Sequence, residues 1–138
     1  MAKIHGGCLC GNIRYSSDTD PLMVVNCYCE NCRKNSGSTH SFNLGMPAGS
    51  LEVWGETVKT YTDRTGASGQ PFYRHFCSNC GTHFRSNGPA YEGIEMLKGG
   101  TLDDPEGFRP AAHIWCEQKP SWIELPEDAP QFPRNPQL

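Results

Sequence analysis

The sequence lacks the features that would direct it to a membrane or a nucleic acid. Among its 138 residues, no apolar run approaches the ~20 residues of a membrane-spanning helix. The sequence contains 12 Lys and Arg and 15 Asp and Glu, and its net charge of −3 leaves no broad basic surface for nucleic acid. Residues 1–7 contain no apolar signal segment, and residues 135–138 contain no cysteine box for lipid attachment. We therefore expect a cytoplasmic protein with no membrane or nucleic-acid partner.

Long helical patterns are missing too. No extended segment has a clean 3.6-residue period, and the 15 Gly and 11 Pro favour a turn-rich β-fold over a helical bundle. A short polar helix is expected over residues 30–35, ended by Gly37. Residues 63–71 and 99–107 are expected to form loops. Period-2 runs predict strands at residues 12–16, 22–25, 51–54, 57–61, 72–76, 82–85, 91–97 and 112–115, with 51–54 and 57–61 paired as a hairpin across Gly55 and Glu56.

The length fits one domain. Residues 1–125 carry the strand patterns, so we expect them to form the folded unit. Residues 126–138 contain four prolines and are expected to form an extended tail on the surface.

Cysteine is abundant, with eight residues in four groups. In a reducing compartment, clustered cysteines more often bind metal or perform chemistry than form disulfides. A C-x-x-C knuckle turns two sulfurs toward one ion, and Gly11 and Gly81 each follow a cysteine where a sharp backbone turn is needed. The groups are Cys8 and Cys10; Cys27, Cys29 and Cys32; Cys77 and Cys80; and Cys116 alone.

The cysteine count suggests one closed and one open zinc site. Two pairs supply the four ligands of a structural zinc site, and the triplet supplies the three ligands of a catalytic one. Two alternatives remain open. The C-x-x-C pair could be a redox pair, although the βαβ context of thioredoxin-like motifs is missing. The triplet could also be closed by a histidine or by Cys116, which otherwise reads as a small packing residue.

The histidines give weaker signals than the cysteines. His113 has the best prospect of lining a pocket. Arg33 and Lys34, directly after the triplet, fit either an anion contact or a solvated turn. The other histidines are expected to be exposed, structural or packed beside the knuckle: His5, His40, His75 and His83.

Five segments together resemble the glutathione-dependent formaldehyde-activating (Gfa) family, to which the zinc domain of centromere protein V is related. The resemblance spans about residues 5–125, and the five segments taken together are highly specific for the family. One departure is Tyr28, where the family often has histidine. The segments are residues 7–15, 27–38, 76–81, 100–105 and 113–115.

The resemblance implies a mainly β, Mss4-like fold of small coiled antiparallel sheets stapled by a structural zinc. It also implies a second, more labile zinc with a catalytic role, so two zinc ions per chain are expected. The implied ligands are Cys8, Cys10, Cys77 and Cys80 for the structural zinc, and Cys27, Cys29 and Cys32 for the catalytic zinc.

The resemblance further implies a carbon–sulfur lyase similar to S-(hydroxymethyl)glutathione synthase. Its partners would be a small thiol such as glutathione and a small aldehyde such as formaldehyde, giving an S-hydroxymethyl thiol. Three cysteinates donate much charge to zinc, which favours binding of the substrate thiol over strong polarisation of a carbonyl. The alternative is a non-catalytic binding module stabilised by zinc at the same cysteines.

Overall fold

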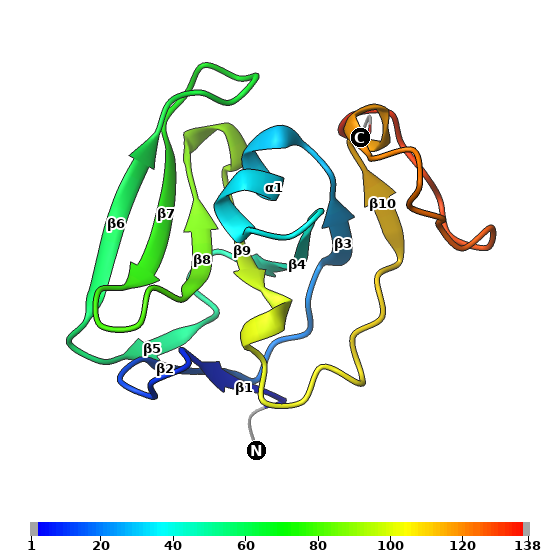
Figure 1. Ribbon diagram of the computed structural model, residues 1–138. Coiled ribbons are helices and arrows are strands. Elements are labelled where there is room, and N and C mark those ends of the chain that lie inside the picture. Colours follow the sequence, from blue (N-terminus) through cyan, green and yellow to red (C-terminus); the bar gives the residue numbers. More distant parts are fainter. Residues whose placement is uncertain (1–2, 137–138) are drawn as a thin grey trace.

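Two β-sheets form the framework of the computed structural model, which describes residues 3–136 (Figure 1). The smaller sheet has the order β1-β2-β5, with strands at Ile4–Gly7, Arg14–Ser17 and Glu52–Trp54. The larger sheet has the order β10-β3-β4-β9-β8-β7-β6. Its strands, in chain order from β3, are Met23–Cys27, Ser41–Pro47 (β4), Val58–Asp63 (β6), Phe72–Cys77 (β7), His83–Asn87 (β8), Ile94–Lys98 (β9) and Ala112–Ile114 (β10).

Helices are few and short among the described residues. The helix α1, Glu30–Ser36, ends at Gly37, which adopts the left-handed conformation with φ 70°. The predicted helix over residues 30–35 is therefore confirmed. The other helical segments of residues 3–136 are three single-turn 3₁₀ helices: η1 at Pro89–Tyr91, η2 at Gly99–Thr101 and η3 at Cys116–Gln118. Within residues 3–136, no helix has the length and apolar character needed to cross a membrane.

The mainly β prediction is confirmed, with two corrections. The β10–β3 pair is parallel, whereas the other pairs of named strands within residues 3–136 are antiparallel. The hairpin predicted across Gly55 is wrong, because β5 pairs with β2 and β6 pairs with β7. Gly55 adopts φ 131° against the backbone of Asn12, so the chain leaves the small sheet here and enters the large one.

The sequence patterns missed β1 and β4. In β4, alternate residues face opposite sides of the sheet. Leu44 and Met46 are fully buried in the core between the sheets. Asn43 is also buried, on the opposite side from its neighbour Leu44. A strand covered on both faces shows no polar-out pattern, which explains why β4 escaped prediction.

Residues 101–103 hold the small sheet against the rest of the protein. The Tyr15 hydroxyl lies 2.6 Å from that of Thr101, and the Arg14 guanidinium forms an ion pair with Asp103. The backbone N–H of Asp103 donates to the carbonyl of His5 at 2.9 Å. These contacts give residues 100–105 of the Gfa-like pattern a structural role.

Candidate metal centres

The first candidate metal centre joins the small sheet to the β7–β8 hairpin. Its four ligand atoms, the sulfurs of Cys8, Cys10, Cys77 and Cys80, all lie within 4.8 Å of one another. The sulfurs of Cys8 and Cys10 are 3.6 Å apart, and those of Cys10 and Cys77 are 3.8 Å apart. A tetrahedral zinc with Zn–S bonds of ~2.3 Å requires sulfurs ~3.8 Å apart. The four residues therefore fit a zinc ion without rearrangement.

Hydrogen-bond donors surround these sulfurs. The N–H of Ile13 donates to the sulfur of Cys8 at 3.2 Å, and the hydroxyls of Thr57 and Thr82 lie 3.2 Å from the sulfurs of Cys77 and Cys80. Hydrogen bonds from the side chain and backbone of Thr82 lower the pKa of Cys80 to about 5. This thiol is therefore ready to bind metal as the thiolate.

Both glycines after the cysteine pairs perform the turn that the sequence suggested. Gly11 and Gly81 have φ of 83° and 81°, in the left-handed region that favours glycine. Their N–H groups donate to the carbonyls of Cys8 and Cys77, at 3.1 and 2.8 Å. The glycines therefore close the two turns, while the residues after them supply N–H groups to the sulfurs.

The second candidate metal centre lies between β3 and α1. The sulfurs of Cys27, Cys29 and Cys32 all lie within 4.8 Å of one another, and among residues 3–136 no other Cys, His, Asp or Glu joins this group. Cys29 caps the helix, because its sulfur accepts the N–H of Cys32 at 3.3 Å. A helix N-terminus favours a negatively charged cap. The triplet therefore offers three converging sulfurs, one fewer than the four protein ligands of a closed zinc site.

The triplet shares its negative charge unevenly. Hydrogen bonds from Cys27 and Cys29 hold the pKa of Cys32 well below its usual range, while the pKa of Cys27 is raised, first by its bond to Cys29. Lys98 on β9 lies close enough for its positive charge to act on Cys32. Its ammonium donates to the side-chain Oδ1 of Asn43 at 2.8 Å. One cation of the sheet therefore faces the anionic cysteines.

A buried ion pair fixes α1 over the sheet. Arg74 on β7 and Asp63 on β6 are 4% and 6% exposed, and Nε and Nη2 of Arg74 both lie 3.0 Å from Oδ2 of Asp63. Asn31 of α1 donates to the same oxygen at 3.3 Å. Although burial alone would raise it, the pKa of Asp63 falls to about 2 because Thr65, Arg74 and Asn31 donate to the carboxylate.

Replacing Asp63 by Asn should lower the free energy of unfolding by ~3–5 kcal/mol, because Arg74 would remain buried without its counter-ion. The lowered pKa means that this contribution is fully present above about pH 4 and is lost only as the pH falls toward 2. Urea denaturation at pH 7 measures the effect. The matched control is Asp128→Asn in the exposed pair with Arg109, which should cost under ~1 kcal/mol. Equal losses in both variants would contradict the role given to Asp63.

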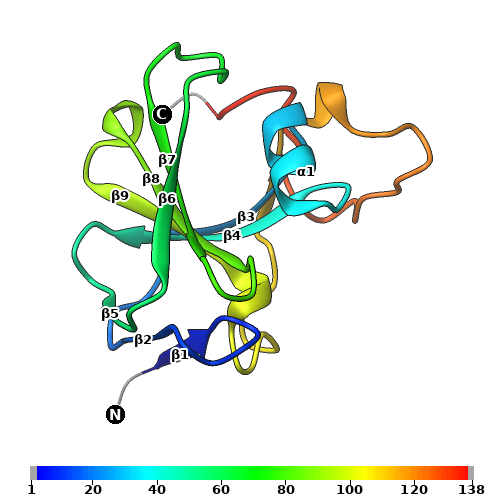
Figure 2. The ribbon, with the colours of Figure 1, turned by 60° about the vertical axis from the view of Figure 1, so that its left-hand side comes forward.

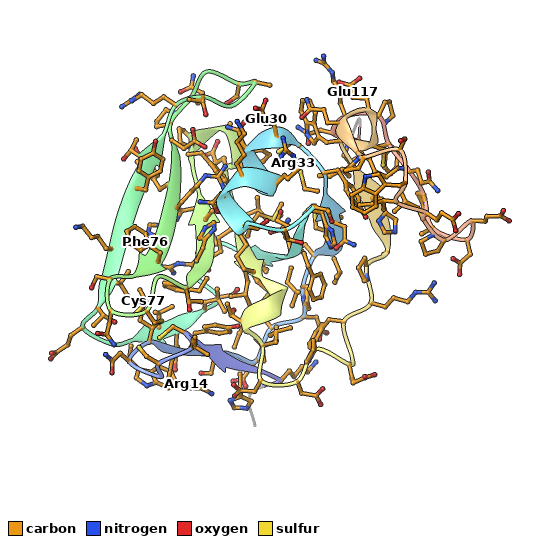
Figure 3. The ribbon with its side chains drawn as sticks, in the orientation of Figure 1. Arg14, Glu30, Arg33, Phe76, Cys77 and Glu117 are labelled. Atoms are coloured by element: carbon orange, nitrogen blue, oxygen red, sulfur yellow. The ribbon has the colours of Figure 1, made fainter. Side chains whose placement is uncertain are left out.

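The remaining candidates occupy supporting positions. His113 is buried at 4% exposure, and its ring packs near Tyr28. Cys116 donates to the carbonyl of His113 at 3.4 Å and belongs to neither cysteine group. Lys34 forms an exposed ion pair with Glu30 at 2.9 Å. Figure 3 shows Glu30 and Arg33 at the outer end of α1.

The other histidines also lie outside both cysteine groups. His40 packs on the ring of Tyr28, with 5.1 Å between centroids, and His5 is exposed. On the β7–β8 hairpin, His75 bridges Thr60 and Asn87, and His83 contacts the carbonyl of Arg85. They pack or support the fold, as the sequence indicated for most of them.

Sequence reasoning did not find Lys98, Asn43, Asp63 or Arg74. These residues come from four strands, and the sheet register pairs Lys98 with Asn43 and brings Arg74 close to Asp63. The one available signal was a lysine, Lys98, directly after the predicted strand over residues 91–97.

Comparison with known proteins identifies a family and solved structures with a similar fold. The family model of the glutathione-dependent formaldehyde-activating enzyme matches residues 3–118. No curated protein matches the chain. The crystal structure of a Rhodobacter sphaeroides protein superimposes with a TM-score of 0.56 at 18% identity, covering 75% of this chain and 94% of that one. At such identity the likeness concerns the fold alone.

Proposed function

Because the chain belongs to the glutathione-dependent formaldehyde-activating enzyme family, we propose that it reversibly adds a small thiol, such as glutathione, to formaldehyde or another small carbonyl compound. The product is an S-hydroxymethyl thiol, so the enzyme is a carbon–sulfur lyase acting in both directions. A reducing compartment such as the cytosol suits it, since both the cysteines and the substrate thiol must stay reduced.

One observation carries the proposal: the same chain holds a group of four cysteine sulfurs and a separate group of three. Four protein ligands close a zinc site, whereas three leave a position for a substrate. We assign the structural zinc to Cys8, Cys10, Cys77 and Cys80, and the catalytic zinc to Cys27, Cys29 and Cys32.

The reaction forms a C–S bond and an O–H bond, breaks the S–H bond and the C=O π bond, and changes no oxidation state overall. The thiol sulfur bonds to the carbonyl carbon, the C=O π electrons move to oxygen, and that oxygen gains the proton that the thiol gave up. When bound at the triplet, zinc would stabilise the substrate thiol as its thiolate. Cys27, Cys29 and Cys32 would hold the metal, and they would make it a weak electrophile toward the carbonyl.

Lys98 supports this chemistry through its charge. Its ammonium is fixed by Asn43, and burial lowers its pKa, an effect that the charges of the three sulfurs oppose. A cation at this position offsets the three thiolates and favours a further anion, the substrate thiolate, beside them.

Exchange NMR of glutathione with formaldehyde tests the proposal. At fixed concentrations, catalytic amounts of the zinc-loaded protein should make the hydroxymethyl and free-thiol forms exchange faster than they do in buffer, which broadens their signals. The equilibrium between the two forms should not shift. Bovine serum albumin at equal thiol concentration controls for unspecific catalysis. Rates equal to those in buffer would contradict the proposal for this substrate pair. Zinc analysis of the same sample would then show whether both sites are filled. Filled sites without catalysis would support the non-catalytic zinc module.

A further inference from the structure

One face of the large sheet carries the cysteine triplet together with three polar side chains. Cys27 on β3 lies directly opposite Ser41 on β4. Two residues along β4, Asn43 lies directly opposite Lys98 on β9. Directly opposite residues of an antiparallel pair point to the same side of the sheet, as do residues two apart in one strand. The three polar side chains therefore share the face of Cys27.

The helix α1 completes the triplet beside this face. It begins soon after β3 and contacts β4, and Figure 2 shows it, in cyan, beside both strands. The sulfurs of Cys29 and Cys32 thereby come within 4.8 Å of that of Cys27. Directly opposite residues of an antiparallel pair have Cα atoms ~4.5–5.5 Å apart. Ser41 is therefore an immediate neighbour of the triplet across the β3–β4 pair.

A chain of hydrogen bonds with a fixed direction leads from Lys98 to Ser41. The ammonium of Lys98 donates to Oδ1 of Asn43 at 2.8 Å. An ammonium can only donate, so the oxygen of the amide faces Lys98 and its nitrogen is left for other groups. That nitrogen donates to the hydroxyl oxygen of Ser41 at 2.8 Å and to the carbonyl of Ser41 at 3.3 Å. The lysine at the start of the chain therefore sets the direction of each bond.

The hydroxyl hydrogen of Ser41 is directed away from this chain. The hydroxyl oxygen accepts from Asn43, so its own hydrogen is left for a third group. Ser41 and Cys27 are 4% and 6% exposed, so bulk water does not provide the acceptor. A thiolate across the strand pair is a charged acceptor, which makes a stronger bond than a neutral one. In agreement, the pKa of Cys32, which hydrogen bonds from Cys27 and Cys29 lower most, is lowered further by a hydrogen bond from Ser41.

We propose that Ser41 donates its hydroxyl hydrogen to a sulfur of the cysteine triplet, and that Asn43 and Lys98 hold it in this orientation. The inference rests on the proposed function, because it treats the triplet as the holder of the catalytic metal. A hydrogen bond withdraws charge from a thiolate, so the cysteines donate less charge to a bound metal. The site then attracts a further anion, the substrate thiolate, more strongly. Ser41 is a positioning residue that acts through the cysteines.

Cadmium-113 NMR tests the hydrogen bond without catalysis. Thiolates are soft ligands that bind soft metals, so cadmium should replace zinc in both sites and give one signal for each. Ser41→Ala should move the triplet signal downfield, because the sulfur then donates more charge to the metal, and should leave the other signal in place. Ser41→Thr keeps a hydroxyl and should restore the wild-type position. Cys29→Ser, which removes the triplet site, assigns the two signals.

Asn43→Asp separates orientation from packing. A carboxylate has nearly the size of the amide and still accepts from Lys98, but it can only accept, so it captures the hydrogen of Ser41. This variant should therefore shift the triplet signal in the same direction as Ser41→Ala. In the Ser41→Ala background, where no hydrogen is left to capture, Asn43→Asp should add no further shift. An equal further shift would show that the new charge acts by itself, and would contradict the role given to Asn43.

The matched control is Ser17→Ala on β2. Ser17 is also 4% exposed, and its hydroxyl accepts the N–H of Thr19 at 3.1 Å, in the small sheet. Its replacement should leave the triplet signal unchanged. In exchange NMR with glutathione and formaldehyde, Ser41→Ala should lower the catalysed rate ~10–100-fold, the usual effect of removing a partner of a metal ligand, and Ser41→Thr should retain the rate.

The outcomes distinguish this inference from the proposed function. An unmoved triplet signal in Ser41→Ala, or equal shifts in Ser41→Ala and Ser17→Ala, would overturn the inference alone. A wild type that catalyses no exchange but shows the expected shifts would overturn only the proposed reaction. A wild type that binds a single cadmium ion would remove the triplet as a metal site, and with it both the proposed function and the inference.

Discussion

Cys80→Ser should leave the protein unfolded at room temperature. Cys80 is one of four sulfurs that tie the turn after β1 to the β7–β8 hairpin, some seventy residues away in the chain. Structural zinc contributes ~10–16 kcal/mol in zinc-finger peptides, whereas domains are stable by only ~5–15 kcal/mol. Serine is a poor ligand for zinc, so the closed site loses its metal together with the contacts it holds.

Far-UV circular dichroism and zinc analysis measure this effect. The matched control is Cys116→Ser, which removes a thiol of equal size outside both cysteine groups and should lower the free energy of unfolding by only ~1 kcal/mol. A folded Cys80→Ser protein that keeps two zinc ions would contradict the structural assignment. Unfolding of both variants alike would show that thiol loss in general, and not the metal site, is responsible.

Cys29→Ser should keep the fold and lose both catalysis and one zinc. The triplet lies between β3 and α1, away from the junction of the two sheets, so its metal is not needed to hold the framework. Serine is also a preferred helix cap, and its oxygen can accept the N–H of Cys32 in place of the sulfur. The helix therefore survives, whereas two cysteines are too few to retain the metal.

Exchange NMR should give a Cys29→Ser rate equal to that of buffer, with zinc falling from two ions per chain to one and the thermal midpoint changing by a few degrees. Mild chelation of wild type should produce the same state, and added zinc should restore it. Full activity in Cys29→Ser would contradict the catalytic role assigned to the triplet. Loss of both zinc ions together, with unfolding, would instead support the non-catalytic module.

Much of the local structure followed from the sequence. The polar segment around Glu30 ended at Gly37 as predicted, because a glycine in the left-handed conformation stops a helix there. The strands on either side of the C-x-x-C knuckle pair across it, as their period-2 patterns indicated. The grouping of the cysteines also followed, since a two-residue gap forces sulfurs of one knuckle toward a common point.

Other parts of the fold did not follow from local patterns. Strand β4 is buried on both faces and shows no alternation of polar and apolar residues. The hairpin predicted across Gly55 failed because a turn signal shows where the chain bends but not which strand it pairs with next.

Cysteine spacing, acting over a few bonds, determined by itself that seven cysteines fall into two pairs and a triplet able to bind metal, whereas the tertiary structure decided that the two pairs meet and the triplet stays separate. The tertiary structure alone decided what surrounds those ligands. Lys98 reaches Asn43 on the neighbouring strand through the sheet register, and Asn31 of α1 donates to Asp63 at the end of β6. Such neighbours lie tens of residues apart in the chain, and their contacts depend on strand order and register, which short-range patterns do not encode.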